Sequence, residues 1–325
     1  MNFMFQEVLI QEVGKNVKKE TSIIEAVATA LDISYDAAHR RTSFKSKFSL
    51  DESIKLAQYF NISLDKLFGT STEKYVSVSR TTSIKNEYDL QEYFETSYNS
   101  LLPLLDRKDC EVYYSAKDIP LFYTLKSNKL SSFKMYVWLK LLDKNFRAYK
   151  FEEFSPKLST LQSAQKLGDL YKDLNTSEIW DITTINSTLK QIHFYYKAGQ
   201  LSLKDSLELC KELKELLDDI SKKVVSKKHK FKLYHNELLL MSNNVLIITP
   251  EQQSLFVPCA MLSYLNTSDK ETCLEAKQYF DKQFYHSRLL NTVGEKEQNQ
   301  FYYKMMQKID ALCDLIKAQD LLGFE

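Results

Sequence analysis

The chain has 325 residues, which is enough for two or three domains of ordinary size. Its 44 Lys and Arg nearly balance 43 Asp and Glu, and with 44% apolar residues and a net charge of +1 the composition suggests neither global disorder nor a polyanion-coating protein. Glycine and proline are scarce, at 6 and 5, whereas tyrosine and phenylalanine number 20 and 19. Because loop-rich β folds use more turn-forming residues, we expect a mainly α fold with a small β element.

The cysteines and the N-terminus bear on the compartment. The N-terminal fifteen residues lack a basic start and a small-residue cleavage site, so they are not typical of a signal peptide. No apolar run approaches the roughly 18 residues that span a membrane. The cysteines are scattered, odd in number and without a CxxC pair, which is typical of buried free thiols in a reducing, cytoplasmic setting. They are Cys110, Cys210, Cys259, Cys273 and Cys313.

Serine caps mark helix starts in the first seventy residues. An amphipathic stretch over 3–13 comes first. Ser22 then precedes a glutamate by three residues, which is capping-box spacing and predicts a helix from residue 23, and Ser49 repeats that spacing. Ser34 can cap a helix over 35–41, and Ser63 a short one that Gly69 closes. The sequence therefore predicts five short helices within residues 1–69.

The segment from Thr21 to Phe68 resembles the Cro/lambda-repressor type of helix-turn-helix domain, also called the xenobiotic-response-element family. The strongest stretches are IIEAVATALDISYDAAHRR and FSLDESIKLAQYFNISLDKLF. Ala28 stands where the family needs a small residue at the helix crossing, and its buried apolar positions match Val27, Leu31, Ile33 and Ala38. The resemblance implies that residues 1–69 bind DNA and that the chain is a transcription regulator.

Two positions depart from the family pattern. Asp32 occupies the turn, where glycine is usual because the backbone there has a positive φ; aspartate tolerates that conformation at a modest cost. Arg41 falls on the last buried position of the second motif helix, which is usually aliphatic. Either that helix ends early or Thr42 takes the packing role.

The second motif helix of this family enters the major groove with its N-terminal residues against base edges. Tyr35 would then touch a thymine methyl or a phosphate, and Arg40 a guanine or a phosphate. Asp36 would accept from cytosine N4, or would only complement the helix dipole. His39 completes this face. The remaining expected contacts go to the DNA backbone, from Ser34, Arg41, Lys45 and Lys47.

The charge of residues 1–69 limits this interpretation. Nine Lys or Arg balance nine Asp or Glu, but residues 39–47 hold five basic side chains and no acid. Because phosphate contacts dominate DNA affinity, a neutral domain with one basic patch predicts weak binding by a monomer. We therefore expect a homodimer that reads half-sites about one helical turn apart. The alternative is a protein-interaction or ligand-sensing protein that keeps the fold without reading DNA.

Residues 70–88, rich in Ser and Thr, are expected to form a linker. Residues 89–325 are then an oligomerisation and possible sensor region, with a possible division near 226 and an unknown effector. Helices are expected over 89–105, 131–142, 203–225 and 295–319, and strands within 110–125 and 231–258. The leucine stripe of 203–225 favours a core position over a dimer seam.

No enzyme motif is present. The sequence lacks GxxxxGK[ST], GxGxxG, GxSxG and HExxH, and no His pairs with Cys at zinc spacing. We therefore expect no catalytic residues, no metal and no cofactor.

Overall fold

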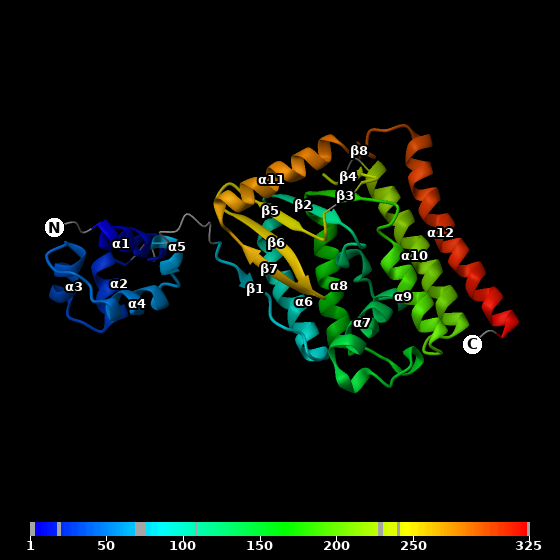
Figure 1. The fold of residues 1–325 in the computed structure, drawn as a ribbon, viewed down its shortest axis with the longest axis horizontal. Coiled ribbons are helices and arrows are strands. Elements are labelled where there is room, and N and C mark those ends of the chain that lie inside the picture. Colours follow the sequence, from blue (N-terminus) through cyan, green and yellow to red (C-terminus); the bar gives the residue numbers. More distant parts are fainter. Residues whose placement is uncertain are drawn as a thin grey trace. The chain divides into compact units, whose positions relative to one another are not determined.

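The chain divides into two units, Met1–Ser77 and Val78–Glu325, in its computed structural model (Figure 1). The structure describes residues 4–17, 21–68, 76–107, 109–226, 230–238 and 241–323. Of the expected linker, 70–75 lie outside these ranges, and the following residues already include a short strand of the C-terminal unit. Each unit has its own apolar core.

The described residues of the N-terminal unit form five helices, of which the second, third and fourth begin where the serine caps predict them. Ser22 and Ser49 both form complete capping boxes with the glutamate three residues later, and Ser34 accepts a hydrogen bond from the Ala37 N–H. These bonds satisfy backbone N–H groups that a helix start otherwise leaves without a partner. The helices are α1 (Met4–Asn16), α2 (Ile23–Leu31), α3 (Tyr35–Thr42), α4 (Leu50–Tyr59) and α5 (Leu64–Phe68).

An eight-stranded mixed sheet organises the C-terminal unit, so the expected mainly α fold with a small β element is wrong. The strand order is β1-β7-β6-β5-β2-β3-β4-β8, in which β2, β3 and β4 run parallel and every other neighbouring pair is antiparallel. The strands are β1 (Ser79–Arg80), β2 (Glu111–Ala116), β3 (Thr176–Trp180), β4 (Lys232–His235), β5 (Val245–Ile248), β6 (Gln253–Ala260), β7 (Ser263–Thr267) and β8 (Arg288–Leu289).

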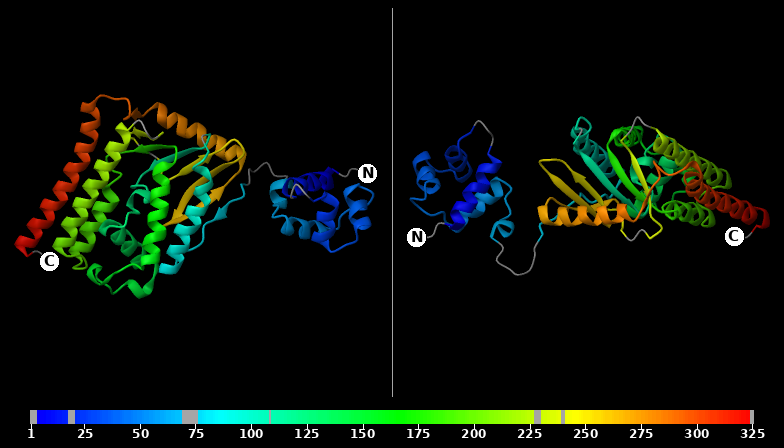
Figure 2. Two further views of the ribbon diagram at one scale, coloured as in Figure 1. Left: turned by 180° about the vertical axis from the view of Figure 1, so that it is seen from behind. Right: turned by 90° about the horizontal axis from the view of Figure 1, so that it is seen from above.

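Two layers of helices cover this sheet. The large core cluster joins β2 and β3 to the helices that surround one face, and a smaller cluster packs α11 against the other face (Figures 1 and 2). Tyr114 belongs to the first cluster and Tyr113 to the second, as alternating side chains of a strand must. The helices are α6 (Glu87–Leu101), α7 (Lys129–Leu142), α8 (Leu158–Asp173), α9 (Asn186–Lys197), α10 (Leu203–Val225), α11 (Lys270–Tyr285) and α12 (Glu295–Leu322).

The leucine stripe of α10 lies in this core. Leu209, Leu213, Leu216, Ile220 and Val224 are all buried, and α12 packs beside them. The core interpretation of the stripe is therefore confirmed, and these side chains are not available as a dimer seam. The strands on either side of residue 226, β3 and β4, pair directly, so the unit continues through that point.

The centre of the sheet holds a buried carboxylate. Glu178 of β3 has no exposed surface, and its oxygens accept hydrogen bonds from Tyr123 (2.7 Å), Tyr171 (2.8 Å) and the Trp180 indole (2.8 Å). The Lys223 ammonium approaches this group over the Phe231 ring. Burial raises the pKa of Glu178, while Lys223 and the three donors oppose that rise.

Candidate nucleic-acid interface

The helix-turn-helix core forms where α2, α3 and α4 meet. Val27 and Leu31 of α2, Ala38 of α3 and Leu56 of α4 are buried together, with Leu9 and Val13 of α1 completing the cluster. Ala28 and Ile33 pack against it while half-buried. The apolar positions expected from the resemblance thus hold α3 against α2.

Asp32 makes the turn between these helices. Its backbone is left-handed, with φ 55° and ψ 52°, as the family pattern requires of this position. The following Ile33 N–H donates to the Ala28 carbonyl (3.1 Å), which closes the end of α2. The turn therefore keeps its usual geometry without glycine, and Ser34 begins α3 two residues later.

One side of α3 faces away from this core. Asp36, His39 and Arg40 are exposed and are spaced by three and four residues, so they share one face of the helix. Tyr35, at the first position of the helix, is 52% exposed. Ser34 is also exposed, but its hydroxyl already caps the helix. These five predicted site residues lie together at the start and along the outer side of α3.

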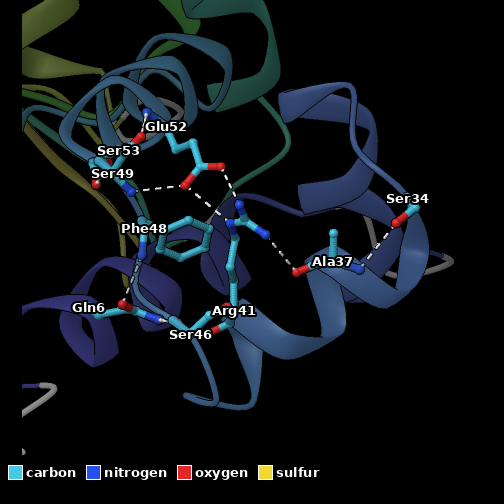
Figure 3. A network of polar contacts seen from close by, with 9 residues as sticks. All are labelled: Gln6, Ser34, Ala37, Arg41, Ser46, Phe48, Ser49, Glu52 and Ser53. Carbon is cyan, nitrogen blue, oxygen red and sulfur yellow. Dashed lines mark hydrogen bonds and ion pairs between the residues drawn. The ribbon is translucent and has the colours of Figure 1, made fainter.

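Arg41 points the other way, toward α4 (Figure 3). Its guanidinium binds the Glu52 carboxylate with both Nε (3.1 Å) and Nη2 (2.7 Å), while Nη1 donates to the Ala37 carbonyl (3.1 Å). Only 23% and 20% of the two side chains are exposed. Arg41 therefore occupies the usually aliphatic position and forms a bidentate ion pair that connects α3 to α4.

Glu52 has two roles in this network. One of its oxygens accepts from the Ser49 N–H (2.9 Å), which completes the capping box of α4, and both accept from Arg41. Burial opposes ionisation of the carboxyl, but the hydrogen bonds from Arg41 and Ser49, together with the Arg41 charge, lower its pKa. The ionised form is therefore the one that the N-terminal unit stabilises.

Gln6 of α1 fixes the loop between α3 and α4. Its amide nitrogen donates to the carbonyls of Arg41 (2.8 Å) and Ser46 (2.9 Å), and its oxygen accepts from the Phe48 N–H (3.1 Å) (Figure 3). Lys45 and Lys47 are exposed on the loop that these bonds hold. The two lysines are thus presented on a positioned segment next to the end of α3.

Sequence reasoning missed Gln6 and Glu52. The signal for Glu52 was an arginine at a position that is usually aliphatic, followed by the glutamate of a capping box. Gln6 gave no signal, because its bonds go to main-chain groups 35 to 42 residues away.

The described residues contain neither a group of three or more His, Cys, Asp or Glu placed to hold a metal ion nor a helix of the length and apolarity that crossing a bilayer requires.

Comparison with known proteins finds a distant similarity to a yeast protein. No family model and no solved structure matches the chain. The meiotic plaque component protein 54 of Saccharomyces cerevisiae (strain ATCC 204508 / S288c) is 25% identical over 345 aligned positions, which take in 98% of this chain and 69% of that protein. Identity at this level does not assign the chain to a family.

Proposed function

We propose that this chain is a sequence-specific, DNA-binding transcription regulator that places α3 in the major groove. The observation that carries the proposal is the joint geometry of α2 and α3: a left-handed turn at Asp32, a buried contact at Ala38, and an outer face that presents Tyr35, Asp36 and Arg40. Helices held in this way read base edges in the major groove in other proteins.

The expected contacts divide by their position on the unit. Tyr35, Asp36, His39 and Arg40 lie where a groove-bound helix meets bases. Lys45 and Lys47, on the loop held by Gln6, lie where phosphates would pass. Arg41 contributes through its ion pair with Glu52, as a support for α3 and not as a phosphate ligand.

The proposal includes a cytoplasmic homodimer. Residues 1–69 carry equal numbers of basic and acidic side chains, so one copy offers DNA little net attraction. Two copies on a palindromic site would double the number of contacts and fix the spacing of half-sites. The C-terminal unit would supply the dimer contact and any effector site. The proposal assigns it no catalytic activity.

A selection from random duplex DNA with the full chain at low salt tests this function. We expect a palindromic sequence to be enriched by the natural chain. The double variant His39→Ala, Arg40→Ala should lose the enrichment, and Lys15→Ala, which removes one positive charge from α1, should keep it. Failure of the natural chain to enrich any sequence would overturn the proposal.

A second candidate is a protein-interaction role for the same fold. The balanced charge of the unit and the engagement of Arg41 within it favour this reading, and the yeast relative is named as a plaque component. A protein-interaction role predicts that the selection finds no salt-dependent DNA binding. It also predicts that a defined protein partner co-purifies with the chain and that this binding depends on Tyr35.

A further inference from the structure

Two cysteines meet across helices α10 and α12. Cys210 of α10 is completely buried, whereas Cys313 of α12 is half-buried and packs against the same core cluster. Cys313 is among the neighbours that raise the pKa of the Cys210 thiol, which agrees with the two side chains lying near each other between the helices. The pair lies in the C-terminal unit, outside the candidate nucleic-acid interface.

The register of the two helices supports this pairing. Lys214, one turn after Cys210, forms an ion pair with Asp310, which lies almost one turn before Cys313. Antiparallel helices that are joined at 214 and 310 bring 210 opposite 313. Helices α10 and α12 run side by side in every view of the unit (Figures 1 and 2).

The two thiols differ in reactivity. Burial, and then the neighbouring Cys313, raise the pKa of the Cys210 thiol, while Lys214 opposes that rise. Because the thiolate is the form that attacks oxidants, the raised pKa makes Cys210 less reactive toward a free oxidant, while its sulfur can still attack a neighbouring sulfenic acid. Cys313 is partly accessible to solvent, so a small oxidant reaches it first.

The other three cysteines have different surroundings. Cys110 and Cys273 are buried elsewhere, at the start of β2 and on α11. Cys259 is exposed on β6, and its sulfur contacts Ser263. Cys210 and Cys313 thus differ from the other cysteines in lying next to a second thiol, and they differ from each other in exposure.

We propose that Cys210 and Cys313 form a redox-active dithiol that a peroxide oxidises to a disulfide joining α10 to α12. The Cys313 thiolate attacks hydrogen peroxide: an S–O bond forms, the O–O bond breaks, and hydroxide leaves with the two electrons lost by sulfur. The Cys210 sulfur then attacks the sulfenic sulfur. The S–S bond forms, the S–O bond breaks, and the Cys210 proton leaves with the departing oxygen as water.

The cross-link would stabilise the C-terminal unit. It closes a loop on the order of a hundred residues, and closing a long loop removes more conformational entropy from the unfolded chain than closing a short one. A dithiol reductant would reverse the reaction by exchange. Oxidation would thus switch the α10–α12 pair between a packed and a covalently fixed state.

The test is peroxide treatment of the folded full chain, followed by alkylation of remaining thiols in denaturant and peptide mapping by mass spectrometry. We expect one species lighter by about 2 Da, with 210 and 313 in a single linked peptide. Its thermal unfolding, followed by tryptophan fluorescence, should shift upward by several degrees and return after reduction.

Three variants make the test specific. Cys313→Ser changes the half-exposed partner and should abolish the linked peptide and the thermal shift while leaving the fold intact. Cys210→Ala should also abolish both, with Cys313 advancing to the sulfinic acid in place of the disulfide. Cys259→Ser, at the exposed cysteine, should leave both unchanged. A natural chain whose Cys313 is oxidised without a 210–313 link, or whose links are scrambled among the five cysteines, would overturn the proposal.

Discussion

The two units of this protein use charged side chains in opposite ways. In the N-terminal unit, Arg41 and Glu52 stabilise the fold as ions, and the Glu52 pKa is lowered by its partners. In the C-terminal unit, Glu178 and Lys134 are buried, and burial is the largest influence on both, disfavouring their charged forms. The comparison indicates that the charged form of a carboxyl is favoured where an arginine and backbone donors surround it, as at Glu52, and is disfavoured where burial dominates, as at Glu178.

The largest expected effect is at the centre of the C-terminal sheet. Glu178→Ala would leave the Tyr123 and Tyr171 hydroxyls and the Trp180 indole without an acceptor and would open a cavity. We expect a loss of roughly 3–5 kcal/mol in the free energy of unfolding.

Tryptophan fluorescence during denaturation measures this loss, because Trp138 and Trp180, the only two tryptophans, both belong to the C-terminal unit. Glu251→Ala serves as the matched control: this exposed glutamate forms a surface ion pair with Arg107, and its loss should leave the free energy of unfolding nearly unchanged. Equal effects of the two changes would contradict the enclosed role of Glu178.

Lys134→Met also changes a buried charged group of the C-terminal unit, but here we expect a gain in stability instead of a loss. Lys134 is 9% exposed and donates to the neutral side chains of Thr188 and Gln191, and burial lowers its pKa to about 8, a fall that Asp118 opposes. At neutral pH the folded state carries a charge that burial penalises, so the variant should be more stable by roughly 1–3 kcal/mol.

The pH dependence identifies the cause. Between about pH 8 and the ordinary lysine value of 10.5, the unfolded chain binds the Lys134 proton and the folded chain does not. Stability of the natural chain should therefore rise with pH across this window, relative to that of Lys134→Met. A constant difference between the two proteins from pH 7 to 10.5 would count against a buried, neutralisable lysine.

In the N-terminal unit, Arg41→Ala removes the ion pair that ties α3 to α4. We expect the free energy of unfolding of this unit to fall by about 1–2 kcal/mol. Amide hydrogen exchange within α4 should then become roughly tenfold faster. Arg40→Ala, the same charge change on the outer face of α3, should leave exchange unaltered.

The effect of the ion pair should also depend on pH. The Glu52 pKa is lowered, so the stability that Arg41 contributes is present above the ordinary glutamate value of 4.5 and is lost as pH falls through the folded pKa. If acid left the exchange difference between the natural chain and Arg41→Ala unchanged, the ion pair would not be its source.

Local signals made the N-terminal unit predictable. Its helices α2, α3 and α4 begin at serine caps, and a capping box is complete within four residues. The C-terminal sheet depends on pairings between distant segments, and β3 carries a buried glutamate where an apolar side chain would have marked the strand. The boundaries of α3 could therefore be read from local signals, whereas the role of Arg41 required the structure to show Glu52 beside it.

The smallest expected effect is at the turn. Asp32→Gly would remove the steric cost of a Cβ at this left-handed backbone position, because glycine has no Cβ. We expect a gain of roughly 0.5 kcal/mol, visible as about twofold slower exchange at the end of α2. Faster exchange in the variant would show that the aspartate side chain itself supports the turn.

The most direct test of DNA reading by α3 is a fluorescence anisotropy titration of the full chain against the duplex enriched by selection. Arg40→Ala should bind about tenfold more weakly than the natural chain, whereas Lys15→Ala, with the same change in charge, should bind within about twofold. Equal affinities for all three proteins would contradict the placement of α3 in the major groove.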